Sequence, residues 1–488
     1  MRTKLSLILL TLMLVGIIYS CRKDAQNADN STLPVAPTNM STARSKMESM
    51  RSADGFAFHL ADRMKDKCRD LTRRLHDARH ETESFISRCK NGPGKYHSHS
   101  NVIYVPQEYP TLQAAVDIAP AGARIVVCGT VAQSGNVLIN TDNLTIEGQE
   151  GRDGDDDHEG HKGPATLKDS NDSLSTDNLV ITAPGVTVKN LKLLNIGIQV
   201  NNPATDVTLA HDKVVNDNLN NPSIITFTNS SRNEITDCCL NGAGINAAGQ
   251  VGILLDSLSN HNEIEDCSVD NTDFAAYDIT GSDNQIKHCR ATNYNLGFAV
   301  YNFLGTTSTT GNVFTDCNAD NCAQGSGFLL YANDVSVFNC SANNCVNAVV
   351  NVSLSSRIEH CSGNGCFQAF INYLANDLTV TDCTANQCSY SGIQVEICSN
   401  FKLTHNTSNG GPGSGIIINN YSGNFSKGIL EDNNTNGNTA FGIYLNSVAN
   451  STIRDNKSVH NGQCDFDQTN CNANTVSHNQ FGNSCSGM

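Results

Sequence analysis

The sequence predicts an all-β solenoid, and two short phrases that recur along the chain predict it. The first phrase runs NEIEDCSVDN from residue 262 and returns as NQIKHCRATN, NVFTDCNADN, VSVFNCSANN, SRIEHCSGNG and LTVTDCTANQ. Asn then replaces Cys in FKLTHNTSNG, GILEDNNTNG and STIRDNKSVH. The repeated residues are Cys267, Cys289, Cys317, Cys340, Cys361, Cys383, Asn406, Asn433 and Asn456, spaced 21 to 28 residues apart. Such a period predicts stacked units that bury their apolar faces only against one another.

The second phrase is a Gly followed by alternating apolar residues. GILLD, GFLLY, GIQVE, GIIIN and GIYLN begin at Gly252, Gly327, Gly392, Gly415 and Gly442. The alternation predicts a short strand with one buried face, and the residues before each repeated Cys or Asn predict another. Asn, Gly and Ser clusters supply the turns. We therefore expect rungs of two or three strands, stacked about 4.8 Å apart, with amide-bonded Asn columns and buried Cys columns.

These repeats closely resemble the right-handed parallel β-helix family, the superfamily of pectate lyases, polygalacturonases and pectin methylesterases, in which an Asn ladder is a hallmark. The segment IYVPQEYPTLQAAVDIAPAGARIVVCGTV (103–131) resembles the N-terminal segment of pectin-methylesterase-like and copper-maturation-type members. The resemblance covers roughly residues 101–488. It implies a single-stranded right-handed parallel β-helix whose first end is closed by a strand and a short helix. It does not imply one activity, because this scaffold serves lyases, hydrolases, esterases, epimerases and binding proteins.

The N-terminal hundred residues predict secretion and anchoring. A basic start and an apolar run lead to Ile18-Tyr19-Ser20-Cys21, which resembles a bacterial lipobox. We expect a signal peptide over 1–20 and a lipidated Cys21 in the bacterial cell envelope, because the apolar run is too short for a spanning helix; an ordinary signal peptide is the alternative. Residues 21–45 have the composition of a linker, and 46–100 predict a basic helical segment. We expect the solenoid over 101–463 and a C-terminal cap over 464–488.

Charge divides the chain and restricts its partners. Residues 41–100 carry 13 Lys and Arg against 8 Asp and Glu, whereas residues 101–488 carry 15 against 38, a net charge of −23. This acidic solenoid argues against nucleic acid as a partner. It also repels acidic polysaccharides unless divalent cations bridge the two. The basic segment could lie on an anionic membrane, dock on the solenoid or act as a solvated spacer.

The 20 cysteines follow the repeat more than a disulfide pattern. Cys267 to Cys383 occur once per repeat, and a second column, Cys322, Cys345, Cys366 and Cys388, follows five residues later. Stacked residues have parallel Cβ directions, which suit disulfide geometry poorly. We therefore predict that most are buried free thiols. Better candidates for a bridge are Cys464, Cys471 and Cys485, and the pair Cys68 and Cys89.

The catalytic phrases of the resembled enzymes are missing. The chain has no GHG, RIK, DFIFG or DPHE phrase and no Trp. Asn140-Thr141-Asp142 and Asp155-Asp156 match two polygalacturonase phrases, but without their partners we interpret them as coincidence. A catalytic set cannot be carried over from the family, so candidate sites have to come from the columns of the repeat.

One candidate site is a loop and two are columns. The loop GRDGDDDHEGHKGP (151–164) places Asp153, Asp155, Asp157 and Glu159 close together, which predicts calcium binding or a solvated acidic insertion. The column after the Gly-led strand would offer ligands to sugar hydroxyls or cations, or simply form turns; it contains Asp256, Asp278, Asn302, Asn351, Asn372, Glu396, Asn419 and Asn446. Its strand parity is ambiguous over 275–279 and 348–352.

The second column is the residue before each repeated Cys or Asn. It mixes acids with His: Asp237, Asp266, His288, Asp316, Asn339, His360, Asp382, His405, Asp432 and Asp455. Interleaved His can relieve repulsion between stacked carboxylates, and a neighbouring pair such as His360 with Asp382 could transfer protons. Tyr277, Tyr301, Tyr331, Tyr373 and Tyr444 recur near the Gly-led strand, where some rings could stack on sugars.

The sequence thus predicts an envelope-anchored β-helix protein that binds or processes carbohydrate. The expected partner is a neutral or calcium-bridged polysaccharide, or a surface protein. If the protein is an enzyme, we expect a polysaccharide lyase, glycoside hydrolase or epimerase that uses residues among Asp256, Asp278, His360 and Glu396. The alternative is a non-catalytic structural or adhesive solenoid. A copper-maturation role is a third hypothesis, although soft ligands are not evident.

Overall fold

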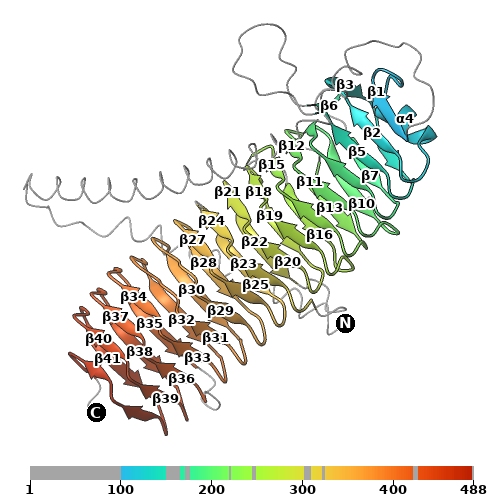
Figure 1. Cartoon of the computed structure of the whole chain (residues 1–488). Coiled ribbons are helices and arrows are strands. Elements are labelled where there is room, and N and C mark those ends of the chain that lie inside the picture. The colour runs from blue at the N-terminus through green and yellow to red at the C-terminus, as the bar shows by residue number, and fades with distance from the viewer. Residues whose placement is uncertain are drawn as a thin grey trace, which may run out of the picture. The chain divides into compact units, whose positions relative to one another are not determined.

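The computed structural model describes residues 101–149, 165–170, 176–218, 221–244, 249–301, 309–320, 322, 325–420 and 427–485. They form parallel sheets wound into a right-handed solenoid, with one short helix among the described residues (Figure 1). The all-β, right-handed parallel β-helix predicted from the sequence is confirmed. The predicted signal peptide, Cys21, the linker, the basic helical segment and the acidic loop 151–164 lie outside the described residues.

Sheet A has 16 parallel strands, and the sequence supplies the first strand of each rung to it. Its strands are β1 (Val102–Val105), β2 (Arg124–Val127), β5 (Thr145–Gly148), β8 (Thr187–Lys189), β11 (Thr208–Ala210), β14 (Glu234–Thr236), β17 (Glu263–Glu265), β20 (Gln285–Lys287), β23 (Val313–Thr315), β26 (Ser336–Phe338), β29 (Arg357–Glu359), β31 (Thr379–Thr381), β33 (Lys402–Thr404), β36 (Ile429–Glu431), β39 (Thr452–Arg454) and β42 (Thr475–Ser477). From β8 to β39 the middle residue of each strand is buried, which explains the single apolar residue in the repeated phrase.

Sheet B follows sheet A in each rung and is interrupted once. Its strands are β3 (Thr130–Gln133), β6 (Thr166–Asp169), β9 (Lys192–Leu194), β12 (Lys213–Val215), β15 (Cys239–Asn241), β18 (Ser268–Asp270), β21 (Arg290–Thr292), β24 (Asn318–Asp320), β27 (Ser341–Asn343), β34 (Thr407–Asn409), β37 (Asn434–Asn436), β40 (Lys457–Val459) and β43 (Gln480–Phe481). Between β27 and β34 only single bridges through Ser362 and Thr384 continue the pairing.

Sheet C has 14 strands, and it contains the Gly-led phrases. Its strands are β4 (Val137–Ile139), β7 (Asn178–Ile181), β10 (Gly197–Asn201), β13 (Ser223–Thr228), β16 (Val251–Leu255), β19 (Ala275–Ile279), β22 (Leu296–Tyr301), β25 (Ser326–Tyr331), β28 (Asn347–Asn351), β30 (Gln368–Tyr373), β32 (Ser391–Glu396), β35 (Ser414–Asn419), β38 (Phe441–Asn446) and β41 (Cys464–Thr469). Each Gly lies where a Cβ would strike a neighbouring rung or sheet; at Gly392 it would meet the Ser408 hydroxyl and the Gly415 carbonyl.

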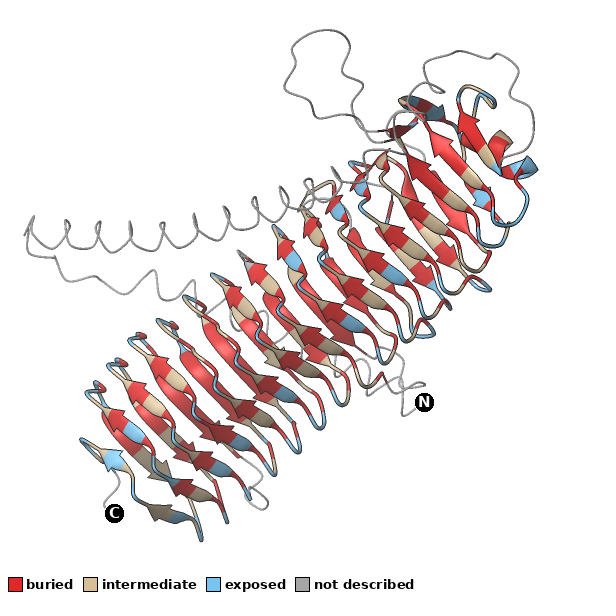
Figure 2. Cartoon of the chain, in the orientation of Figure 1, coloured by how far each residue is buried: buried red, intermediate tan, exposed pale blue. Residues whose placement is uncertain are grey.

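The core fills the space between the three sheets. Figure 2 shows buried residues along the strands and exposed residues mainly at the turns. Tyr277, Phe298 and Phe328 stack in consecutive rungs, with ring centroids 4.6 and 4.9 Å apart. Because each rung repeats the same inward positions, identical side chains lie above one another, and this stacking explains why the sequence repeats.

The turn from sheet A to sheet B, hereafter the A–B turn, holds the repeated Cys and Asn residues. The Cys residues of this column are buried and free, as the sequence predicts. The Sγ of Cys267 donates to the carbonyls of Glu265 (3.2 Å) and Ile235 (3.5 Å). In the later rungs, the Asn433 amide donates to the Asn456 side-chain oxygen at 2.9 Å, as predicted for an Asn ladder. A separate Asn ladder crosses the turn from sheet C to sheet A through Asn233, Asn262, Asn284 and Asn312.

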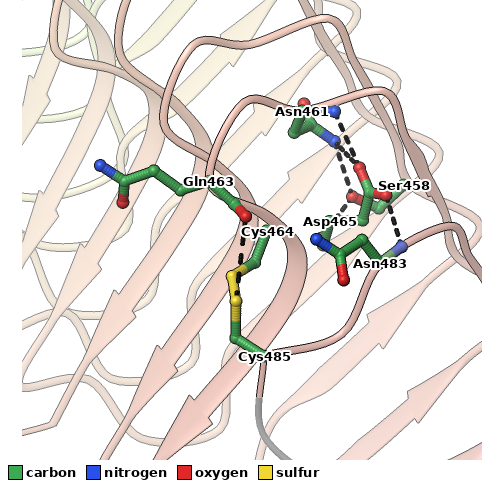
Figure 3. The surroundings of a disulfide bond; sticks show 7 residues. All are labelled: Ser458, Asn461, Gln463, Cys464, Asp465, Asn483 and Cys485. Carbon is green, nitrogen blue, oxygen red and sulfur yellow. Dashed lines mark hydrogen bonds between the residues drawn. A yellow bond between two sulfur atoms is a disulfide. The ribbon is translucent and has the colours of Figure 1, made fainter.

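The two ends of the solenoid are finished differently. At the first end, helix α4 (Leu112–Ile118) begins at the cap Thr111 and buries Leu112, Ala115 and Val116 against β1, β2 and β4. At the other end, Cys464 and Cys485 form a disulfide beside the bonds of Asp465 to Asn461 and Asn483 (Figure 3). Residues 464–481 add one strand to each sheet, so the segment predicted as a cap is also the last rung.

Candidate functional site

The outer face of sheet C carries three of the four predicted catalytic residues. Pairing places the outward residues in a middle column that runs through Leu254, Asp278, Ala299, Leu329, Val350, Ile371, Gln394, Ile417 and Tyr444. Two residues further along the strands lies an edge column, in which Tyr301 pairs with Tyr331 and the run Tyr373, Glu396, Asn419 and Asn446 is continuous. Asp278 and Glu396 therefore belong to different columns.

The structure corrects the single ligand column expected from the sequence. Asn351 and Asn372 point inward and are fully buried, and the Asn351 amide donates to the Asn372 side-chain oxygen at 3.0 Å. Asn351 pairs with Leu330 and Asn372 with Val395, both core residues. The expected column assumed the wrong strand parity at these rungs. Asn351 and Asn372 follow Ala348 and Ala369, which take the position of the Gly, by three residues, whereas Glu396 follows Gly392 by four. Asn302 lies outside the described residues.

A polar network connects Glu396 to the centre of the face. Gln368 Nε2 donates to Gln394 Oε1, and Gln394 Nε2 donates to Glu396 Oε1, both at 2.5 Å. The Ser391 hydroxyl donates to the same Gln394 oxygen at 3.1 Å. The network orients the Glu396 carboxylate, which is half-buried at the end of β32. The Gln368 and Gln394 amides are buried and bonded within the network, so the group left for sugar hydroxyls is the half-buried Glu396 carboxylate, which accepts hydrogen bonds.

Two stacked aromatic rings lie just before the first residues of the same two strands, at the end opposite Glu396. Phe367 precedes β30 and Tyr390 precedes β32; their ring centroids are 5.6 Å apart with an interplanar angle of 22°. The Tyr390 side chain is 50% exposed, although large aromatic side chains are usually mostly covered. A ring of this kind offers a flat surface for the apolar face of a sugar. The sequence does not single out Phe367, Gln368, Tyr390 and Gln394, because their residue types do not recur at those positions of the repeat.

Asp278 is a second polar residue on the outer face of sheet C, and its neighbours in the middle column are apolar. It lies between Leu254 and Ala299 and is 7% exposed. The Tyr301 hydroxyl donates to Asp278 Oδ2 at 2.8 Å, whereas Oδ1 has no hydrogen-bond partner within the described residues. Burial raises the pKa of Asp278 to about 6 despite the Tyr301 hydrogen bond. Burial and the Asp278 charge raise the pKa of Tyr301.

Asp256 has a structural role at the end of β16. Its Oδ1 accepts from the backbone nitrogens of Asn229 (3.0 Å) and Leu258 (3.1 Å) and from the Ser259 hydroxyl (2.8 Å). These bonds are typical of an Asx turn, the alternative that the sequence left open for this column. The hydrogen bonds occupy the Asp256 oxygen that would otherwise face a ligand.

His360 lies apart from the other three residues. It occupies the A–B turn, where Nδ1 is 3.9 Å from Asp382 Oδ2. Along sheet C, five pairings separate β19, which holds Asp278, from β32, which holds Glu396; at about 4.8 Å per strand they are roughly 24 Å apart. Two carboxyl groups that act on one glycosidic bond stand about 5 to 9.5 Å apart. Asp278, His360 and Glu396 therefore do not form one catalytic set.

Residues 357–488 match the family described as "Right handed beta helix region". Among curated proteins, none matches the chain. Similar solved structures include the catalytic unit of a thermostable GH87 α-1,3-glucanase from Streptomyces thermodiastaticus, at 11% identity over 81% of this chain and 72% of that chain with a TM-score of 0.43. The A-module of mannuronan C-5 epimerase AlgE6 from Azotobacter vinelandii matches at 12% identity over 77% and 95%, with a TM-score of 0.40.

The Dettilon tailspike protein (gp208) matches at 15% identity over 76% of this chain and 68% of that chain, with a TM-score of 0.42. These likenesses concern the winding of the strands, and the identities are too low to transfer a site. Among the described residues, no helix is long and apolar enough to cross a membrane.

Proposed function

We propose that this protein binds carbohydrate on the outer face of sheet C, across β30 and β32. The observation that supports this proposal is the exposed Tyr390 ring directly before β32, the strand that ends at the oriented Glu396 carboxylate. Stacking on the ring would hold the sugar face, and Glu396, held in place by Gln394, would accept hydrogen bonds from its hydroxyls. The strands repeat at about 4.8 Å, so an extended glycan could contact several rungs at once.

A neutral glycan suits this face better than an acidic one. Glu396 contributes a negative charge, and the solenoid as a whole carries −23. The other polysaccharide class is an acidic glycan bridged to the protein by calcium. In that case the acidic loop with Asp153, Asp155, Asp157 and Glu159 would bind the calcium. We favour binding over catalysis, because the candidate carboxyl groups are dispersed along the solenoid.

The proposal is tested by titrating the protein with neutral and acidic oligosaccharides, with and without Ca²⁺, by calorimetry. We expect Tyr390→Ala and Glu396→Gln each to weaken binding at least tenfold. Ile429→Ala, which removes a 38% exposed side chain from sheet A, is the control and should bind normally. Unchanged affinity in both sheet C variants would overturn the assignment. No binding by any glycan would favour the structural or adhesive solenoid, and release of reducing ends would add catalysis.

We also propose that Cys21 is lipidated and anchors the protein in the bacterial cell envelope. The lipobox-like Ile18-Tyr19-Ser20-Cys21 supports this proposal. Wild-type protein should partition with membranes and Cys21→Ser should be soluble after cell lysis. A soluble wild-type protein would instead favour an ordinary cleaved signal peptide.

A further inference from the structure

The A–B turns present a row of charged side chains that carbohydrate binding does not use. In every rung from Asn190 to His478, the residue before the position of the repeated Cys or Asn has a φ of 50° to 58°. Asn, Asp and His adopt this left-handed conformation more readily than most residues. The row is exposed and points away from the core, so its charges remain available to a ligand.

Three of the His residues in this row pair with one carboxylate each. His211 Nδ1 lies 3.5 Å from Asp237 Oδ2, His360 Nδ1 lies 3.9 Å from Asp382 Oδ2, and His405 Nε2 lies 3.5 Å from Asp432 Oδ2. These pairs relieve repulsion between neighbouring acids, which is the stabilising role predicted from the sequence. These three pairs are the reference with which His288 is compared.

His288 has carboxylates on both sides. Its Nδ1 lies 3.5 Å from Glu265 Oε1 and 4.0 Å from Asp266 Oδ1, on the preceding rung. Its Nε2 lies 3.5 Å from Asp316 Oδ2, on the following rung. No hydrogen bond joins the ring to these groups within the described residues. The neighbouring cation, Lys287, is already paired with Glu263 at 2.5 Å. Three carboxylates therefore share one imidazole.

The spacing of these atoms suits a metal ion. One ligand atom each from Glu265, Asp266 and His288 lie within 4.8 Å of one another. Zinc binds imidazole nitrogen and carboxylate oxygen at about 2.0 to 2.2 Å, which places tetrahedral ligands about 3.4 Å apart. The separation of 3.5 Å between His288 and Glu265 matches that value. Asp316 would hold the other ring nitrogen, as a carboxylate does behind many metal-binding His residues.

We propose that Glu265, Asp266 and His288 bind one divalent transition-metal ion of the zinc class, with Asp316 orienting the imidazole. The mixed nitrogen and oxygen ligands favour Zn²⁺ over the all-oxygen coordination typical of Ca²⁺. Three protein ligands leave at least one position open to water or to a ligand group. The site joins two consecutive rungs of sheet A and is independent of the proposed carbohydrate face.

The experiment is a calorimetric titration of the full chain with Zn²⁺, and wild type is compared with variants because His residues elsewhere can also bind the metal. We expect His288→Ala to lose one binding event or to weaken it at least tenfold. Asp266→Asn should do the same, and Asn keeps the left-handed turn. His405→Ala removes an equivalent His with a single partner and should titrate like wild type. Visible spectra with Co²⁺ should change in the same two variants.

An isotherm unchanged by His288→Ala would overturn the site. An equal loss in His405→Ala would also overturn it, because the binding would then belong to the row in general. Melting curves recorded without metal separate loss of binding from loss of fold. If His288→Ala unfolds, Asp266→Asn decides the question alone.

Discussion

The A–B turn is built from Cys in the rungs between residues 238 and 383, and from Asn in the rungs between 406 and 479. Both residues donate to the same two backbone positions. Cys361 Sγ donates to the carbonyls of Glu359 (3.2 Å) and Val337 (3.4 Å), and Asn433 Nδ2 donates to those of Glu431 (3.0 Å) and Leu403 (2.9 Å). The Asn side chain also connects rungs, because Asn433 Oδ1 accepts from the backbone and amide nitrogens of Asn406.

The comparison shows that one turn can be stabilised in two ways. Cys acts as a small buried residue with a weak donor, so each Cys rung contributes mainly packing. The Asn side chains hydrogen-bond to one another in a continuous chain of amides. The stability of each Asn rung therefore depends on the neighbouring rungs. The Asn region should therefore be the more cooperative and the less tolerant of substitution.

The largest expected effect comes from breaking the Asn chain at its middle. Asn433→Ala removes the amide that donates to the Leu403 and Glu431 carbonyls and to Asn456 Oδ1, and it removes the oxygen that accepts from the backbone and amide nitrogens of Asn406, which should cost about 3 to 5 kcal/mol. Cys361→Ala removes one sulfur atom from the core and should cost about 1 to 2 kcal/mol. Urea denaturation measures both. Equal losses would show that the two ladders stabilise the turn equally.

Asp212 tests a third residue type in the same turn. It is 2% exposed; Oδ1 accepts from Leu191 N at 2.9 Å, and Oδ2 has no partner within the described residues. Burial raises its pKa from 3.8 to about 7. The neutral carboxyl therefore stabilises the fold below about pH 4, and this contribution is lost as the pH rises through 7.

Asp212→Asn should remove this loss and stabilise the protein above pH 7 by roughly 2 to 4 kcal/mol, given about 1.4 kcal/mol for each pKa unit. Unfolding free energies measured from pH 4 to 8 should fall more steeply for wild type than for the variant, in which Asp278 still causes a smaller loss. Asp217→Asn, at an exposed position two residues after β12, is the control. Parallel pH profiles for wild type and Asp212→Asn would contradict the assignment.

A smaller effect should follow from moving the boundary between the two ladders. Cys383 N already donates to Asn406 Oδ1 at 2.9 Å, so Cys383→Asn would extend the amide chain by one rung. Cys289→Asn would place an amide between Cys267 and Cys317, where no amide oxygen continues the chain. We expect Cys289→Asn to be less stable than Cys383→Asn by about 1 to 2 kcal/mol. Thermal melts of the two variants check this order, and equal melting temperatures would indicate that only side-chain volume matters.

The smallest perturbation is chemical labelling of the native protein. The ladder thiols are buried, and burial raises the pKa of Cys340 and Cys383 well above the usual value. Cys239, on the outer face of sheet B, is exposed. A thiol reagent should label Cys239 first, and the ladder only after unfolding. Rapid labelling of Cys361 in native protein would show that the Cys rungs open locally.

The repeat allowed most of the fold to be predicted, because short local signals in the sequence specify each rung. A strand of one buried residue between two turns leaves a clear period in the sequence, and the left-handed Asp, Asn and His residues mark the turns. The short helix α4 was expected from the resemblance of residues 103–131. The pairing of Cys464 with Cys485 was one of several bridges considered, because sequence spacing alone does not choose between Cys471 and Cys485.

The candidate site was less predictable, because it depends on which side chains of neighbouring rungs point to the outer face of sheet C. Asn351 looked equivalent to Glu396 but points inward, because it lies three residues after the position of the Gly and Glu396 lies four residues after it. Gln394 and Tyr390 do not recur at their positions of the repeat, and they meet Gln368 and Phe367 only through the pairing of β30 with β32. The arrangement around His288 required knowing that Glu265 lies on the preceding rung and Asp316 on the following rung, although the sequence spacing changes from 22 to 28 residues.

Helix α4 has a consequence for how copies of this protein can meet. A parallel solenoid could in principle grow into a filament if the last rung of one molecule continued into the first rung of the next. Within the described residues, only the bridge of Phe466 to Ser484 pairs with the far side of the last rung, which consists of β41, β42 and β43. Growth would also require an accessible first rung, and α4 covers that end of the core. A single terminal helix is therefore enough to block head-to-tail fibre formation, even though the opposite end has no equivalent helix in the described residues.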